Sequence, residues 1–328
     1  MPVVTPDYKA PRWLAGAHLQ TIVPAKLCKR PKVNYRRERW DTPDGDFVDV
    51  DWVNADLQDP KTPVLLHIHG LEGSSQSHYA LALMDAVAHR GWRGVVSHFR
   101  SCSGELNRTK RAYHAGDTAE VKWLIETVHA RYPEAPIYLV GVSLGGNQVA
   151  LFLGQQGEAA RQWVKAAVSV GAPLDLVAGS NLMRQGFNRL YAEMFLETLI
   201  PKALKKLEQF PELSKFYTAE QMKACKHFYD FDSLFTGPVH GYQNAMDYWL
   251  KASAKPHLKN VRVPLLLLNA KNDPFMPAWA LPTADDISEF VWLDQPQEGG
   301  HIGFPLGRPP GRLDYLPKRI MRFFDEGQ

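Results

Sequence analysis

The sequence predicts an α/β fold, with a mainly parallel sheet of eight strands, helices on both faces and a helical cap inserted after the sixth strand. Two observations carry this prediction. Short apolar runs alternate with segments of helical periodicity over most of the chain. The alternation stops between residues 174 and 240, where the sequence is helical and aromatic with no clear strand, and then resumes. Repeated βα units are typical of a parallel sheet covered by helices.

The first third of the chain supplies one edge of the sheet. Residues 1–35 are proline-rich and basic, and we predict an irregular lead-in with an ordered segment at 18–22. Alternating residues at 36–41 and 47–53 flank a Pro-Asp-Gly turn, which predicts a β-hairpin. Buried strands are predicted at 64–69 and 94–99, with helices over 77–90 and about 117–131.

The rest of the chain repeats this pattern around the cap. Predicted strands at 137–140 and 166–171 flank a helix from 144 to about 156. After the cap come strands at 263–269 and 290–293, a helix near 278–284 and a final helix from about 313 to 324. The α/β core therefore comprises residues 1–173 and 241–328, and the cap comprises residues 174–240. The cap carries an apolar stripe that either packs as core or lines a ligand pocket, namely Met183, Phe187, Leu190, Tyr191, Met194, Phe195, Leu199 and Ile200.

Composition limits the classes of partner. The net charge of +3 gives no nucleic-acid signal. Basic residues between 26 and 39 are interrupted by proline and aromatic residues, which favours a solvated surface over a lipid patch. Cys28, Cys102 and Cys225 lack C-x-x-C spacing, so neither disulfides nor zinc is implied. No run approaches the ~20 apolar residues of a membrane span, and no signal-like segment precedes residue 35. We expect a cytoplasmic protein; the sequence does not indicate its oligomeric state.

A motif for nucleophilic catalysis lies at the fifth predicted strand. Gly141-Val142-Ser143-Leu144-Gly145 sits where that strand turns into a helix. Such a turn strains the corner residue, and glycines on either side remove the Cβ atoms that would clash. The bare five-residue pattern also arises by chance, but the strand before it and the helix after it predict Ser143 as a nucleophile.

Candidate partners for Ser143 follow later strands. A serine hydroxyl needs a base, and that base needs an acid to orient it. Asp273 and His301 lie in loops after consecutive predicted strands, in the chain order Ser-Asp-His expected for this architecture. Considered separately, each residue has a non-catalytic interpretation: Asp273 could be a turn residue before Pro274, and His301 could be a histidine in a surface loop. Asp294 is a competing acid, but it precedes His301 on the same connection, whereas Asp285 and Asp286 fit a helix end. We predict Asp273.

Two backbone amides are predicted to form an oxyanion hole. One is that of Leu144, which follows the nucleophile, and the other is that of Leu71 in a glycine-flanked loop after the third strand. The preceding His67 and His69 share one strand face and offer a metal alternative. No further ligand motif supports a metal, so a structural or loop-orienting role is favoured for His69.

These motifs together resemble the α/β-hydrolase superfamily, and within it the YheT-type group of bacterial hydrolases related to animal phospholipid- and acylglycerol-cleaving members. The matching segments span most of the chain, namely residues 18–21, 69–73, 99–105, 141–147, 231–242, 272–274 and 300–303. The resemblance implies a carboxylic ester hydrolase that needs no cofactor or metal, with Ser143, Asp273 and His301 as its triad. Ser101 stands where the group more usually has glycine, which affects a local turn rather than the chemistry.

The sequence hypothesis is therefore a serine esterase or lipase-like enzyme for short- to medium-chain acyl esters, with acylglycerols among its candidate substrates. A thioesterase or an acyltransferase would use the same triad, and a non-catalytic small-ligand-binding protein would not need it. Lys202, Lys205 and Lys206 follow the apolar stripe and offer at most a weak peripheral contact with anionic lipid.

Overall fold

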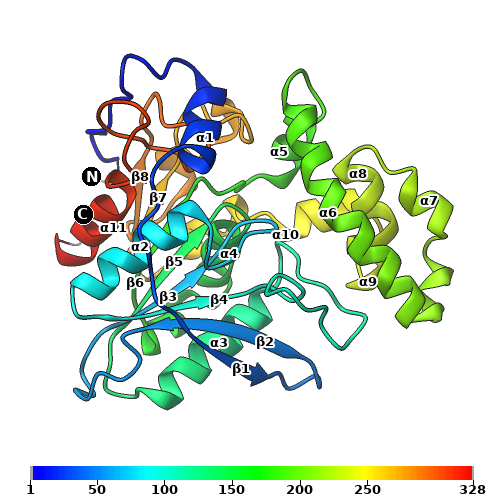
Figure 1. The fold of residues 1–328 in the computed structure, drawn as a ribbon, viewed down its shortest axis with the longest axis horizontal. Coiled ribbons are helices and arrows are strands. Elements are labelled where there is room, and N and C mark those ends of the chain that lie inside the picture. Colours follow the sequence, from blue (N-terminus) through cyan, green and yellow to red (C-terminus); the bar gives the residue numbers. More distant parts are fainter. Residues whose placement is uncertain (1–2, 327–328) are drawn as a thin grey trace.

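The predicted alternation of strands and helices is confirmed, and the strands form one sheet (Figure 1). The computed structural model describes residues 3–326. Within this range the sheet has eight strands in the order β1-β2-β4-β3-β5-β6-β7-β8. They are β1 (Arg36–Asp41), β2 (Phe47–Val53), β3 (Val64–Ile68), β4 (Arg93–Ser97), β5 (Ile137–Val142), β6 (Val164–Val170), β7 (Leu265–Leu268) and β8 (Val291–Asp294).

Strand direction distinguishes one edge of the sheet from the rest. β1 and β2 form the predicted antiparallel hairpin, and β2 also runs antiparallel to β4. The remaining neighbours are parallel. Because both faces of the parallel part are covered, β3, β4 and β7 are buried along their whole length. The carboxyl ends of these parallel strands lie at one edge, so the loops that follow β3, β5, β7 and β8 meet there.

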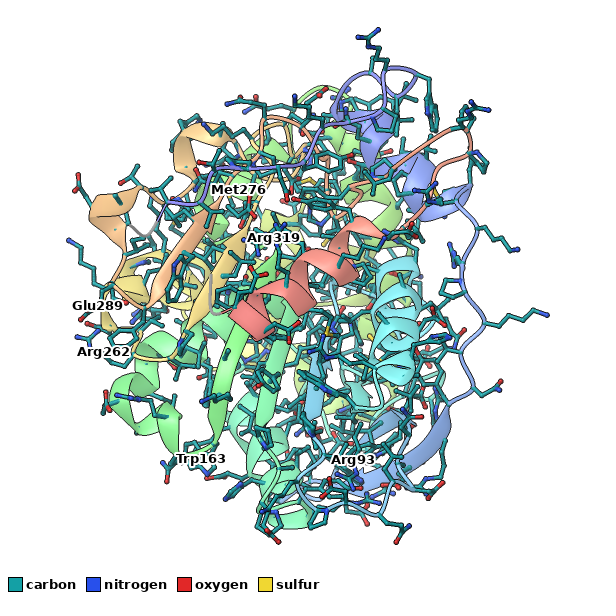
Figure 2. All side chains as sticks on the ribbon, turned by 90° about the vertical axis from the view of Figure 1, so that its left-hand side faces the viewer. Arg93, Trp163, Arg262, Met276, Glu289 and Arg319 are labelled. Atoms are coloured by element: carbon teal, nitrogen blue, oxygen red, sulfur yellow. The ribbon has the colours of Figure 1, made fainter. Side chains whose placement is uncertain are left out.

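Helices cover both faces of the sheet. α2 (His78–His89) and α11 (Tyr315–Glu326) share a hydrophobic cluster with one face, whereas α3 (Thr118–Arg131) and α4 (Leu144–Gln156) pack on the other. Neighbouring residues of β3 point to opposite faces, since Leu65 belongs to the first cluster and Leu66 to the second. Figure 2 looks onto the face that α2 and α11 cross. No helix within residues 3–326 is long and apolar enough to cross a bilayer.

A group of helices is inserted between β6 and β7 and lies to one side of the sheet (Figure 1). It has a hydrophobic cluster of its own, formed by Leu196, Ala203, Leu213, Tyr217, Met222, Cys225, Phe231 and Phe235. Its elements are α5 (Leu176–Leu182), α6 (Asn188–Gln209), a 3₁₀ helix (Pro211–Lys215), α7 (Ala219–Lys223), α8 (Phe228–Phe231), a π-helical turn (Asp232–Thr236) and α9 (Gly237–Val239). α10 (Ala245–Ala252) packs with α5 through Trp249 and Leu176. We keep residues 174–240 as the proposed cap, with α10 joining it to the core.

Two local predictions differ from the structure. The lead-in contains a ten-residue helix, α1 (Ala17–Lys26), which buries the polar side chains of Gln20 and Thr21. Its apolar residues have no helical period, so only tertiary contacts could reveal it. The helix predicted near 278–284 is wrong, because only short 3₁₀ turns form there. Pro282 interrupts this segment, lacks an N–H group and disfavours helical geometry at the residue before it.

Candidate active site

Ser143 occupies the sharp corner between β5 and α4. Its φ of 53° and ψ of −120° are strained for a residue with a side chain. The corner can form because the flanking residues are glycines. A Cβ on Gly141 would lie 2.3 Å from the Gly145 carbonyl oxygen, and a Cβ on Gly145 would lie 2.4 Å from the Ile68 carbonyl oxygen. This local geometry matches the nucleophile elbow that the motif predicts.

The structure brings Ser143, His301 and Asp273 into one hydrogen-bonded chain. The Nε2 atom of His301 lies 3.0 Å from the Ser143 Oγ atom, and Nδ1 lies 2.8 Å from Oδ2 of Asp273. His301 and Asp273 are 6% and 4% exposed. A carboxylate accepts hydrogen bonds only, so the proton of a neutral imidazole belongs on Nδ1. Nε2 is then free to accept the serine proton.

Further contacts fix the acid and the ring. The second carboxylate oxygen of Asp273 accepts the Phe275 N–H at 2.7 Å. The Phe275 ring stacks on the His301 imidazole with ring centres 4.0 Å apart. The N–H and the ring of Phe275 thus restrict rotation of the Asp273 carboxylate and of the His301 imidazole, respectively.

The competing carboxylates have other partners. Asp294 accepts a 2.7 Å hydrogen bond from the Nε atom of Arg319 on α11, and both side chains are 1% exposed. Figure 2 labels Arg319 on this helix, which crosses one face of the sheet. Asp286 accepts hydrogen bonds from the backbone and hydroxyl of Thr283. Of the acids weighed from sequence, Asp273 is therefore the one bonded to His301.

Helix α1 holds the loops that carry Asp273 and His301. The amide oxygen of fully buried Gln20 accepts hydrogen bonds from the side chain of Asn272 and the N–H of Gly299, both at 2.9 Å. The Thr21 hydroxyl accepts the His301 N–H at 2.9 Å and donates to its own helix. Sequence analysis missed these roles, because both residues lie more than 250 positions before their partners. The matching segment at residues 18–21 was the available signal.

The loop after β3 lies directly against the serine. A Cβ on Gly70 would be 3.0 Å from the Cβ of Ser143, so the backbone of this loop passes close to the nucleophile candidate. Leu71 and Leu144, whose amides are the predicted oxyanion donors, both line the adjoining cavity. Whether the two amides act together in catalysis stays a prediction, developed below.

The two histidines of β3 and its loop have structural partners. His67 Nδ1 bonds to the Val140 carbonyl at 2.9 Å. His69 Nδ1 bonds to the Gly70 carbonyl at 2.7 Å, and its Nε2 accepts the Phe99 N–H at 3.0 Å. Burial lowers the pKa of both histidines, that of His67 to about 4. Among residues 3–326, no three His, Cys, Asp or Glu side chains are grouped as metal ligands.

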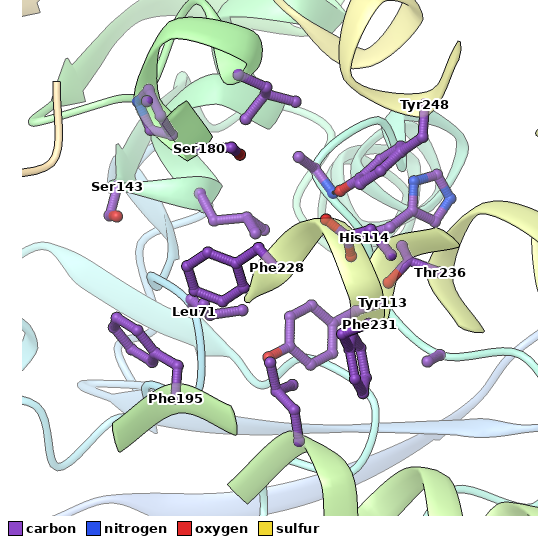
Figure 3. A pocket seen from close by; sticks show the side chains of 18 of the residues that line it. Leu71, Tyr113, His114, Ser143, Ser180, Phe195, Phe228, Phe231, Thr236 and Tyr248 are labelled. Atoms are coloured by element: carbon purple, nitrogen blue, oxygen red, sulfur yellow. Dashed lines mark hydrogen bonds between the residues drawn. The ribbon is translucent and has the colours of Figure 1, made fainter. Parts of the chain in front are cut away.

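A mainly apolar cavity of about 1200 Å³, solvent at its mouth included, connects Ser143 with the cap. Figure 3 shows Ser143 at one side, Phe195 and Phe228 from the cap beside it, and Tyr113 and Phe231 further along. Figure 3 shows His114, Thr236 and Tyr248 on the side of the cavity away from Ser143, and Asp232 is another polar residue of the lining. Burial raises the pKa of the Asp232 carboxyl to about 6.

The predicted apolar stripe of the cap divides into three sets. Tyr191 and Ile200 pack in hydrophobic clusters. Met183, Phe195 and Leu199 line the cavity. Three others face solvent instead, since Phe187, Leu190 and Met194 are about half exposed. Helical spacing identified an amphipathic segment but could not say which of its apolar residues reach the cavity.

Comparison with known proteins identifies the family of this chain. A family model described as the alpha/beta hydrolase fold matches residues 63–307. The candidate esterase YheT of Escherichia coli (strain K12) is 40% identical over 94% of this chain and 90% of its own length. Human phospholipase ABHD3 is 32% identical over 98% of this chain and 79% of its own. A yeast monoacylglycerol lipase is 28% identical over 82% of this chain and 61% of its own.

Solved structures show the same fold at low sequence identity. An esterase of Pyrococcus furiosus is 14% identical, with a TM-score of 0.53 over 98% of this chain and 97% of that one. Mouse alpha/beta hydrolase domain-containing protein 10 has the same identity and TM-score over 89% of this chain and all of its own. From the family match and the similarity to YheT, the chain belongs to the α/β-hydrolase family, in the group that contains YheT.

Proposed function

We propose that this protein is a serine carboxylic ester hydrolase of the esterase or lipase type. One observation carries the proposal: the hydrogen-bonded chain from Asp273 through His301 to Ser143 opens into an apolar cavity. A poor nucleophile is placed beside an oriented base, and the cavity suits an acyl chain. The relatives named esterase, phospholipase and monoacylglycerol lipase all point to ester substrates.

Acylation begins when His301 Nε2 takes the proton of the Ser143 hydroxyl while Oγ bonds to the ester carbonyl carbon. The resulting tetrahedral intermediate collapses and breaks the bond to the alcohol oxygen, which receives the proton from His301. The acyl group remains on Ser143. Asp273 holds the imidazole in the required tautomer and stabilises its positive charge.

Deacylation reverses these roles with water. His301 removes a proton from water as the water oxygen attacks the acyl carbonyl. The tetrahedral intermediate then collapses, the bond between the acyl carbon and Ser143 Oγ breaks, Oγ takes the proton back from His301, and the carboxylic acid is released. In both steps the carbonyl oxygen becomes negative. We assign its stabilisation to the Leu71 and Leu144 amides, which flank Ser143 on the loop after β3 and on α4.

The substrate class follows from the cavity. Phe195 and Phe228 of the cap lie beside Ser143, and Leu199 also lines the cavity. These apolar side chains favour uncharged acyl groups, and we propose chains of short to medium length. Acylglycerols are candidate substrates on this basis. The cap sets chain length and head group.

The test is hydrolysis of p-nitrophenyl esters from acetate to dodecanoate by wild type and Ser143→Ala. We expect the variant to lose several orders of magnitude in turnover, as when other triads lose their nucleophile. Ser180→Ala is the matched control, because Ser180 also lines the cavity and has no histidine partner in the proposed reaction. Parallel assays with acyl thioesters and with an alcohol acceptor measure the competing acyl transfers. Full activity in Ser143→Ala would refute the proposal.

A further inference from the structure

An ion pair connects the cap with the loop that contains Leu71. Lys202 lies on α6, and its Nζ atom is 2.7 and 2.8 Å from the two carboxylate oxygens of Glu72. The side chains are 29% and 10% exposed, so the pair is largely shielded from water. Glu72 directly follows Leu71, the predicted oxyanion donor. The contact therefore joins the cap to the backbone beside the reacting carbonyl.

The backbone at Glu72 needs support. Residues 70–73 form a turn closed by a 2.9 Å hydrogen bond from the Gly73 N–H to the Gly70 carbonyl. Within it Glu72 has a φ of 53°, a left-handed conformation that residues with a Cβ adopt infrequently. Such a residue keeps this conformation only when surrounding contacts fix it. Its side chain and its N–H both have partners that do so.

Tyr113 is the partner on the core side. Its hydroxyl donates to the Glu72 carboxylate at 2.7 Å and accepts the Glu72 N–H at 3.1 Å. The Tyr113 ring stacks on Phe99 at 4.6 Å, so this side of Glu72 is fixed by the core. Lys202 fixes the opposite side from the cap. The turn is thus fixed by Tyr113 of the core and by Lys202 of the cap, which are far apart in the sequence.

Charge gives Lys202 a second role. The carboxylate of Glu72 is one residue from an amide that would stabilise a developing negative oxygen. An unpaired carboxylate at this position would repel that oxygen, and the shielded surroundings would strengthen the repulsion. The ammonium group of Lys202 neutralises this charge.

We propose that Lys202 is a positioning residue for ester hydrolysis, and that its ion pair with Glu72 holds the Gly70–Gly73 turn so that the Leu71 amide faces the oxyanion. This inference rests on the proposed function. Because Lys202 lies on α6, the Leu71 amide takes up this orientation only when α6 packs against the core. Hydrogen-bond donors contribute most when they are fixed before charge develops, which is the condition that the ion pair secures.

The helix offers a matched control and an independent anchor. Lys205 is exposed one turn along α6, so Lys205→Met makes the same change of charge without touching Glu72. Lys206 donates to the backbone carbonyls of Asn107 and Thr109, and these bonds still attach α6 to the core when Lys202 is replaced. A rate effect of Lys202→Met is therefore not explained by release of the cap, and because Lys202 also lines the cavity, the Glu72→Gln variant shows whether the effect passes through the turn.

The experiment compares kcat and KM for p-nitrophenyl butyrate among Lys202→Met, Lys202→Arg, Glu72→Gln and Lys205→Met. We expect Lys202→Met to lower kcat about 10- to 100-fold with little change in KM, somewhat less than loss of a whole oxyanion donor. Lys202→Arg keeps the ion pair and should retain most of kcat. Lys205→Met should match wild type.

The double variant Lys202→Met/Glu72→Gln separates charge from position. Because it leaves no unpaired carboxylate, we expect a higher kcat than in Lys202→Met alone, and a lower one than in wild type. The rate of labelling by a fluorophosphonate should follow kcat, because the phosphonyl oxygen occupies the same hole.

Two outcomes would overturn the inference: an unchanged kcat in Lys202→Met, or a loss that appears only as a higher KM. If Lys202→Met does not fold, a wild-type kcat in Glu72→Gln overturns it equally. The two proposals can fail separately. If a fluorophosphonate labels Ser143 completely in every variant, the proposed serine hydrolase stands even when the kcat values contradict the role of Lys202.

Discussion

Thr21→Val tests whether α1 positions the histidine loop. Threonine and valine have nearly the same shape, but valine has no oxygen to accept the His301 N–H that the Thr21 hydroxyl now accepts at 2.9 Å. His301 is 6% exposed, so water does not readily replace the lost acceptor. A buried donor without a partner costs ~1–3 kcal/mol.

This free energy appears either in catalysis or in stability. If the loop shifts to find another partner, His301 leaves its position beside Ser143. Since each tenfold step in rate corresponds to about 1.36 kcal/mol, kcat/KM then falls by about 5- to 150-fold. If the loop stays in place, the free energy of unfolding falls by the same ~1–3 kcal/mol.

The assay measures kcat/KM for ester hydrolysis and urea unfolding on the same preparations. Thr21→Ser keeps the hydroxyl and is the control, so it should lie close to wild type in both measurements. A Thr21→Val protein with wild-type kcat/KM and a wild-type free energy of unfolding would refute the role of α1 in the site.

Three further predictions concern the corner, the acid stability and the cap. Gly145→Ala places a Cβ 2.4 Å from the Ile68 carbonyl oxygen, so we expect a loss of ~1–3 kcal/mol in thermal or urea unfolding, and an unchanged Tm would contradict the packing. Burial raises the pKa of Asp46, but hydrogen bonds from residues 107–109 outweigh it and lower that pKa from 3.8 to about 2. Stability of about 2 kcal/mol is therefore present above pH 4 and lost as the pH falls toward 2, and urea unfolding of Asp46→Asn should depend less on pH in that range. Leu199→Trp fills part of the cavity, and its optimum in the p-nitrophenyl ester series should move to shorter chains; an unmoved optimum would place the acyl chain elsewhere.

Local patterns were sufficient for the parts of the molecule that depend on neighbouring residues. The strands could be predicted because buried parallel strands read as continuous apolar runs. Ser143 could be predicted because its corner requires glycines at fixed offsets, and Asp273 and His301 because they follow consecutive strands. The sheet edge was recognisable from the Pro-Asp-Gly turn of the hairpin.

Contacts between distant segments could not be predicted in this way. Gln20 and Thr21 act through loops near the other end of the chain, and the matching segment at residues 18–21 indicates that they matter without identifying those partners. The Lys202–Glu72 pair likewise joins two elements 130 residues apart. Helical spacing in α6 showed an amphipathic segment, but only packing determines that Leu199 lines the cavity while Leu190 faces solvent.

The most direct test of the central claim is covalent labelling of the enzyme by a fluorophosphonate, followed by intact-protein and peptide mass spectrometry. A fluorophosphonate reacts with a serine that is activated by an oriented base. The account predicts one adduct per chain, located on Ser143, and no adduct in Ser143→Ala. Labelling that persists at another residue in Ser143→Ala, together with retained ester hydrolysis, would show that the nucleophile lies elsewhere.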